Sequence, residues 1–485
     1  MTTRFAFACC VVVLSPLFAA EGQVIRVKTL PVAESEQFSF LPSAGMAGVS
    51  IALADTLLDP FLNPAKGSRL KSSQYFGAPS FFSVSANSGA GTTFPLGAMW
   101  KRGSSFASLS AAFQKIHRPE NTSFAGSFRS IDGPFVSPPP AQPTPSTSNN
   151  SYTLAFFGHR LDSARLSFGV GALWSGLGAV DGVEQFYHGN DWLRQKGEAR
   201  DLRLGVLKEW QRGSSLEAVV VYNHFDHGHD AGFTDLFWSP AQRQTIGRPR
   251  TEHGGEDTET WGLQVEYERP VVDSTWRAGV TMTVNRISHG RIPSYELFRG
   301  MGTTGFSTAF NGGVGVSKLT PSYVIGADLL YEPITSTTRA GDSVTNRFSF
   351  SNARLRGGVS RTFALADPGS SFSIQLGTEL YSVSYAMNQR DHVSGVARVR
   401  KEAWLEQLRT AGMSFRVPGV EVHYHVRTRI GVGRPGVVVT SPNTSPPIVF
   451  DDLSSAPWML PQPSASALGP VRVAWHQFAI SIPHR

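Results

Sequence analysis

The chain is poor in cysteine and in long apolar runs. Its 485 residues include 2 cysteines, Cys9 and Cys10, and both lie within the first ten positions. A mature chain that lost this region would contain no cysteine, which excludes disulfide frameworks, zinc–thiolate sites and cysteine nucleophiles. No later segment reaches the roughly 18 consecutive apolar residues that a membrane-spanning helix needs. The chain is therefore expected to be either a soluble protein or a membrane β-barrel.

Charge is also sparse. Charged residues make up 17% of the chain, and the basic residues behind its net charge of +7 are spread along the sequence. Nucleic-acid binding would need a basic patch or a known module, so no nucleic-acid partner is expected. Glycine and aromatic residues are abundant instead, with 48 Gly, 32 Phe, 11 Tyr and 10 Trp. This composition favours strands joined by tight turns.

Residues 1–22 have the pattern of a secretory signal peptide. A single cation, Arg4, precedes an apolar stretch from 5 to 14, and small residues follow as far as Gly22. The apolar stretch is too short for a membrane anchor. We therefore expect export, with cleavage between Ala19 and Gly22.

Apolar and polar side chains alternate along many segments. The pattern is clear at 165–175, 261–268, 276–285, 323–332 and 420–430. Successive side chains of a strand point to opposite faces, but soluble sheets alternate too. Aromatic residues near the ends of the apolar rows favour a lipid-facing band. In lipid an open sheet would leave backbone groups unpaired, so the sheet is expected to close.

Short and long connections also alternate along the chain. Turns such as 319–322 and 417–419 are short, whereas connections such as 226–257 and 388–409 are long. This rhythm is typical of bacterial outer-membrane proteins, with short turns in the periplasm. The prediction is an all-β, transmembrane, antiparallel up-and-down barrel of about 14 strands (range 14–16), formed by residues 74–485 and located in the cell outer membrane.

The segment ahead of the first strand carries a family resemblance. Residues 43–67 read SAGMAGVSIALADTLLDPFLNPAKG. This is similar to the N-terminal signature of the FadL-type outer-membrane transporter superfamily, which includes long-chain fatty acid and aromatic hydrocarbon transporters and PorV-type relatives. The sequence departs from the pattern at Ala47, Thr56 and Lys66. The matching residues are Gly45, Met46, Gly48, Ala52, Ala54, Asp55, Asn63, Pro64 and Ala65.

The resemblance implies both a structure and a function. Residues 23–73 would form a periplasmic leader and a hatch inside the lumen. The protein would take up hydrophobic small molecules passively, without a cofactor, and would contact outer-membrane lipid, with a monomer favoured. Two alternatives stay open: a PorV-type secretion accessory that binds proteins, and a general porin-like channel. No nucleophile-elbow sequence is present, so an enzyme is not expected.

Three groups of residues are candidates for a functional role. Charged residues on the second face of the strands are expected to form a polar network in the lumen, because unpaired charge in a confined space is costly. The network candidates are Glu266, Arg277, Asp328, Glu332, Glu421, His423, His425 and Arg427. Residues 400–409 could form a short helix at the barrel mouth, with Trp404, Leu405 and Leu408 clustered. No metal site is predicted; His224, His227 and His229 are weak candidates, since their spacing fits no known zinc motif.

Overall fold

The computed structural model describes residues 44–53, 59–84, 89–117, 147–179, 192–292, 303–340, 344–392, 395–434 and 469–484. Extended strands account for most of them, as the alternating sequence predicts. The predicted signal peptide lies outside the described residues. The strands are β1 (Ser73–Gly77), β2 (Ser80–Val84), β3 (Gly89–Arg102), β4 (Ser105–His117), β5 (Thr147–Leu161), β6 (Leu166–Leu177), β7 (Trp192–Glu209), β8 (Ser215–Ser239), β9 (Gln244–Pro270), β10 (Trp276–Ile292), β11 (Thr303–Leu319), β12 (Tyr323–Ala340), β13 (Val344–Ala364), β14 (Ser371–Asp391), β15 (Ala397–Val417), β16 (Val420–Arg434) and β17 (Gly469–His484).

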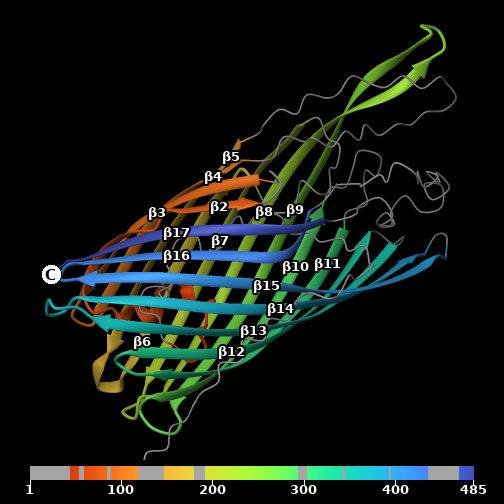
Figure 1. The fold of residues 1–485 in the computed structure, drawn as a ribbon. Coiled ribbons are helices and arrows are strands. Elements are labelled where there is room, and N and C mark those ends of the chain that lie inside the picture. Colours follow the sequence, from red (N-terminus) through yellow and green to blue (C-terminus); the bar gives the residue numbers. More distant parts are fainter. Residues whose placement is uncertain are drawn as a thin grey trace, which may run out of the picture.

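The strands form one closed antiparallel ring (Figure 1). Each strand pairs with its neighbours in the sequence, and both β1 and β2 pair with β17 and β3. β1 and β2 keep one register across the break at Ala78–Pro79, since Gly77 lies opposite Ile480 and Ser80 lies opposite Gln477. They therefore act as one strand, and the 17 elements make a barrel of 16 strands. Ring closure pairs the backbone groups that an open edge would expose.

The closed antiparallel barrel confirms the predicted fold class, but the central strand count of about 14 was too low. Two weakly patterned segments account for the difference. β11 (Thr303–Leu319) is rich in small residues, and the end of β15 has a poor apolar alternation. Both are strands because pairing on two sides satisfies their backbone, whatever their side-chain pattern.

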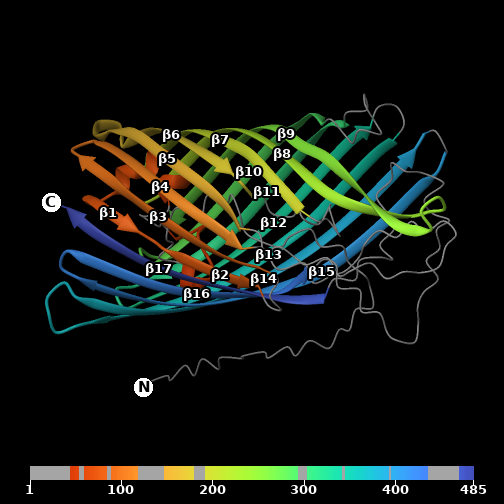
Figure 2. The ribbon, with the colours of Figure 1, turned by 90° about the horizontal axis from the view of Figure 1, so that it is seen from above.

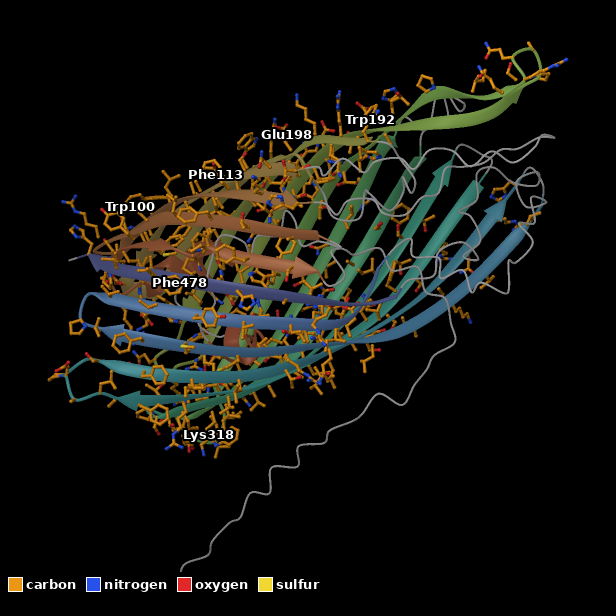
Figure 3. All side chains as sticks on the ribbon, turned by 45° about the horizontal axis from the view of Figure 1, so that its top comes forward. Trp100, Phe113, Trp192, Glu198, Lys318 and Phe478 are labelled. Atoms are coloured by element: carbon orange, nitrogen blue, oxygen red, sulfur yellow. The ribbon has the colours of Figure 1, made fainter. Side chains whose placement is uncertain are left out.

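The outer wall of the barrel is apolar. On β10, Val280, Met282 and Val284 face outward and are 50%, 45% and 39% exposed. Figure 3 shows Trp100 and Phe113 likewise projecting from the outside of the wall. Large apolar side chains exposed all around a closed sheet indicate a lipid-facing surface. Among the described residues, no helix is long and apolar enough to cross a membrane.

Short turns gather at one end of the barrel, as predicted. The turns at Gly103–Ser104 and Pro418–Gly419 are tight, and both glycines have positive φ, 56° and 88°. At the other end the β8–β9 hairpin projects beyond its neighbours (Figures 1 and 2). The prediction of a long loop at 226–257 was therefore wrong. The two arms of this hairpin pair continuously from Ser215 with Glu268 to Ser239 with Gln244, which satisfies the backbone without a loop.

The predicted helix at 400–409 was also wrong. Trp404, Leu405 and Leu408 lie in β15, which pairs with β14 along nearly its whole length. Helix-forming residues in this segment form a strand because β14 offers backbone partners throughout, and β16 offers them from Gln407 onward. Leu405 points outward and is 60% exposed, so it does not join a helical cluster.

Candidate functional site

The N-terminal segment lies inside the barrel. Its two described parts, Ala44–Leu53 and Asp59–Leu70, contain the short helices η2 (Ala44–Met46), α1 (Asp59–Leu62) and η3 (Pro64–Arg69). In Figures 1 and 2 these red-to-orange turns sit within the ring of strands. Of the residues that carry the family resemblance, Ala54 and Asp55 lie outside the described residues. The others fall in the two described parts.

The first part is fixed to the wall through its backbone. Asp328 Oδ2, on β12, accepts hydrogen bonds from the amide groups of Ser50 (2.7 Å) and Ile51 (3.3 Å). Thr410 Oγ1, on β15, accepts from the amide of Ala47 at 2.9 Å. Three wall side chains donate to carbonyl groups of this part: Thr410 to Gly45, Arg356 to Gly48 and Ser317 to Ala52. Such bonds hold the chain in place without depending on the identity of its small side chains.

The second part is bound to the wall by side chains of several strands: Glu209 pairs with Arg69 at 3.0 Å, and Arg203 and Lys101 donate to the carbonyl groups of Phe61 and Ser68, both at 2.7 Å. Glu217, on β8, accepts a hydrogen bond from Asn63 Nδ2 at 2.8 Å and pairs with Lys66 Nζ at 2.7 Å. Asn63 also caps η3, because its Oδ1 accepts from the amide of Ala65 at 3.1 Å and Pro64 opens the helix. Asparagine at the N-cap and proline at the first helical position are favourable choices. The Asn-Pro-Ala motif thus both starts a helix and anchors it to the wall.

Close backbone contact explains part of the glycine content of the wall. A β-carbon at Gly377, on β14, would overlap the backbone of Met46 and Ala47. Gly357, on β13, has open space beside it. The N-terminal segment therefore requires the missing side chain at the first position and not at the second.

We expect Gly377→Ala to destabilise the docked segment by about 1–3 kcal/mol, the range for an extra methyl group in a tight contact. The temperature at which the folded band on a gel converts to the unfolded band should fall. Gly357→Ala is the matched control and should leave that temperature unchanged. Equal behaviour of the two variants would contradict the contact.

The eight predicted lumenal residues separate into several local groups. Arg277 pairs with Glu268, Arg354 pairs with Glu332 at 3.0 Å, and Asp328 holds the N-terminal segment. Glu421 contacts Arg416 at 2.7 Å and His423 at 3.1 Å.

The remaining members make ring contacts or line a cavity. The His423 and His425 rings stack with centroids 6.0 Å apart, and the Arg427 guanidinium lies 4.4 Å from the Trp475 ring centroid. Glu266 lines a small polar cavity with Glu217 and Glu268. Sequence reasoning missed Glu217 and Glu268, although Glu268 shares the strand face of Glu266.

That cavity lies where the two parts of the N-terminal segment meet the wall. Ser50 and Leu53 border it from the first part, and Lys66 and Arg69 border it from the second. Ser215 and three glutamates complete the lining: Glu217, Glu266 and Glu268. An apolar solute would find no favourable surface there, because each polar group must keep a polar partner.

Another part of the lumenal wall carries large apolar side chains. Strands β1 to β6 and β17 direct these side chains inward in three clusters, one of which packs with Phe61 and Leu70 of the N-terminal segment. Phe61 of α1 contacts the rings of Phe76 and Phe156 edge to face, at 5.9 and 5.8 Å. We call this set the lumenal apolar surface: Phe61, Leu70, Phe76, Ala78, Met99, Phe106, Leu154, Phe156, Ala479, Phe82, Ile116, Ala179, Trp475, Ala112, Tyr152 and Leu177, with Leu173, Ala199, Phe225 and Val473 partly buried beside it.

Several polar groups within this surface bond to one another. Gln114 Oε1 accepts from Asn150 Nδ2 and from the Tyr152 hydroxyl, both at 2.9 Å, and Gln114 Nε2 donates to Thr93 at 3.1 Å. Such mutual bonding removes the cost of the polar atoms in an apolar setting. The surface was not predicted from the sequence. The sequence feature that could have revealed it is the presence of aromatic pairs such as Tyr75–Phe76 and Phe81–Phe82. Neighbouring residues of a strand face opposite sides of the wall, so one ring of each pair faces the lumen.

Two prolines interrupt the hydrogen bonding of the wall beside this surface. At the break between β1 and β2, the amide of Ala78 donates to Pro95 at 3.0 Å and the amide of Phe478 donates to Pro79 at 2.9 Å. Neither proline has an N–H group to return the bond. Two ladder hydrogen bonds are therefore absent at adjacent positions. Proline is normally confined to edges and bulges for this reason.

The weak histidine candidates do not share a metal site. His224 and His227 lie an odd number of residues apart on β8, so they face opposite sides of the strand. His224 Nε2 contacts Asp257 at 3.0 Å, whereas the rings of His227 and His229 lie 5.7 Å apart on the other face. Within the described part of the chain, no group of three or more His, Cys, Asp or Glu residues is arranged to hold a metal ion.

Together, the closed ring, the apolar outer wall and the occupied lumen define a bacterial outer-membrane β-barrel. Its fold is that of the FadL-type outer-membrane transporters. A FadL homologue from Pseudomonas aeruginosa matches with a TM-score of 0.50 over 94% of this chain and 100% of that chain, at 10% identity. This likeness shows the fold alone.

Two further solved structures are similar at a lower level. The toluene transporter TodX of Pseudomonas putida matches at 10% identity and a TM-score of 0.40, over 94% of this chain and 99% of that chain. The CymD monoaromatic hydrocarbon channel matches at 13% identity and 0.36, over 72% and 94%. Both scores are too low to carry an argument. No protein-family model and no curated protein matches the sequence.

Proposed function

We propose that this protein passively takes up hydrophobic small molecules, such as long-chain fatty acids or hydrocarbons, across the outer membrane. The observation that carries the proposal is the lumenal apolar surface. A general water-filled pore would be expected to have a polar interior. Here the inward faces of β1 to β6 and β17 carry three apolar clusters, and several polar side chains among them bond to one another. The cluster residues are at most 9% exposed, so an apolar solute would displace part of their packing and lose its water shell against them.

The same features support a sideways exit. The cavity at the N-terminal segment is lined by charged side chains, which disfavours passage of an apolar solute towards the short-turn end. The break at Ala78–Pro79 adjoins the lumenal apolar surface through Ala78 itself. One hydrogen bond is already missing on the β3 side, at Pro95, and one on the β17 side, at Pro79, so parting the wall along either side would break one bond fewer there. The solute would then pass from the lumen into lipid.

A charge placed on the lumenal apolar surface tests the proposal. Val473 faces the lumen on β17 and packs against the cluster of Phe82 and Trp475. We expect Val473→Asp to lower the uptake of a radiolabelled fatty acid or hydrocarbon at least about tenfold, because desolvating a carboxylate costs several kcal/mol. Thr283→Asp, on the polar half of the wall, adds the same charge and should leave uptake near the wild-type rate.

Cells lacking the protein set the baseline for this assay. Unchanged uptake across several apolar substrates in such cells would refute the proposed function. Purification gives an independent measure. A carrier should retain a lipid or detergent molecule, whereas a secretion accessory should retain protein partners.

A further inference from the structure

Cations and aromatic rings alternate around the outer wall near the short turns. Arg269 on β9, Lys318 on β11 and Arg361 on β13 all share the outward strand face, and Trp276 on β10 and Tyr323 on β12 stand between them. Trp276 lies directly opposite Lys318, and Tyr323 lies directly opposite Arg361. We call these five residues the basic–aromatic row. Figure 3 labels Lys318 on the outside of the barrel.

The row holds its cations against rings. Lys318 Nζ lies 5.3 Å from the centroid of Trp276 and 5.8 Å from that of Tyr323. Arg361 Cζ lies 5.2 Å from the centroid of Phe363 on its own strand. Cation–π contact favours a charge at this position while leaving its N–H groups available on the other side. The apolar band begins one step further along the wall, at Val280 and Val316, which are 50% and 41% exposed.

Acidic residues near the row do not cancel its charge. Asp273, in the turn before β10, accepts hydrogen bonds from the Thr275 amide (2.7 Å), the Thr275 hydroxyl (2.6 Å) and the Trp276 amide (3.1 Å). The hydroxyl bond is the main reason that the pKa of Asp273 lies below its usual value. The charge of Lys318 also lowers this pKa, so the ionised Asp273 offsets part of the charge of Lys318. Even with Asp367 of a neighbouring turn counted, two acids face three cations.

We propose that the basic–aromatic row binds the phosphate-bearing head group of an anionic phospholipid in the leaflet at the short-turn end. Its position is continuous with the lipid-facing wall, so a phospholipid head group is adjacent whenever the barrel is in a membrane. Cations at the row attract the phosphate, and the rings pack at the level of the glycerol backbone, where tryptophan and tyrosine are favoured. Free phosphate would gain the attraction to the cations but not the packing of the rings against a glycerol backbone.

Spin-labelled lipids in reconstituted membranes provide the test. The wild-type barrel should associate with labelled phosphatidylglycerol in preference to phosphatidylcholine at low salt, and the preference should shrink at high salt. The double variant Lys318→Gln, Arg361→Gln should reduce the preference by about fivefold for each lost cation, since each basic residue near a charged membrane surface contributes about 1 kcal/mol.

A second double variant controls for net charge. Lys115→Gln, Arg286→Gln also removes two outward cations, but these lie towards the other end of the apolar band, away from the short turns. It should keep the wild-type preference. An absence of preference in the wild type, or equal losses in the two double variants, would overturn the proposal. Heat-modifiable migration confirms beforehand that each variant is folded.

Discussion

Replacing Glu217 with alanine should turn a closed barrel into a conducting one. The change removes the carboxylate that pairs with Lys66 at 2.7 Å, at a site where the two side chains are 11% and 8% exposed. Removing one member of such a buried pair typically costs about 3–5 kcal/mol. Detachment of the second part of the N-terminal segment relieves that cost. The population with this part detached should then rise about a hundredfold or more.

Single-channel recording in planar bilayers measures this population directly. The variant should show frequent openings, whereas the wild type should remain mostly closed. Glu332→Ala is a suitable control, because it breaks the ion pair with Arg354 within the wall and removes no bond to the N-terminal segment. The frequency of openings in Glu217→Gln should lie between those of the wild type and Glu217→Ala, since the glutamine keeps an acceptor for Asn63. Wild-type conductance in Glu217→Ala would disprove the anchoring role of this carboxylate.

The second large effect is expected at Asp328. Replacing it with alanine removes the acceptor for the amides of Ser50 and Ile51. Each buried amide left without a partner costs about 1–3 kcal/mol. We therefore expect the first part of the segment to leave the wall at least about tenfold more often.

Chemical labelling reports that motion. A Ser50→Cys substitution places a thiol on the segment, and its reaction with a maleimide should be at least about tenfold faster when Asp328→Ala is also present. Asp328→Asn keeps an acceptor oxygen and should give a smaller increase. Equal labelling rates with and without Asp328→Ala would show that this carboxylate does not retain the segment.

The sequence predicts the barrel well because the signals for its strands and turns are local and recur along the chain. Alternation within segments such as 276–285 decides which face is apolar, and turns such as Gly103–Ser104 need particular residue types. The helix expected at 400–409 failed for the opposite reason. Local propensity favours a helix there, but strand pairing is decided by neighbours that the segment itself does not encode.

The candidate site was harder to predict because it is made by contacts across the ring. Glu217 lies 154 positions from Asn63, and Asp328 lies 278 positions from Ser50. The alternation of side chains along the strand predicts that Asp328 faces the lumen, but it does not predict what Asp328 binds. The lumenal apolar surface escaped prediction because strands that are apolar on both faces lose the alternation on which the reading depends. Its residues become one surface only when β17 lies beside β1 and β2.

That ring closure constrains the order of assembly. The seam joins residues 73–84 to the C-terminal strand, and its side-chain bond between Ser481 and Gln74 spans 407 positions of sequence. Contacts of such long range form late, because they require the whole intervening chain to be placed first. The N-terminal segment contacts walls on opposite sides of the lumen, at Glu217 and at Thr410. The segment can therefore complete its docking only when β8 and β15 both stand in place around it.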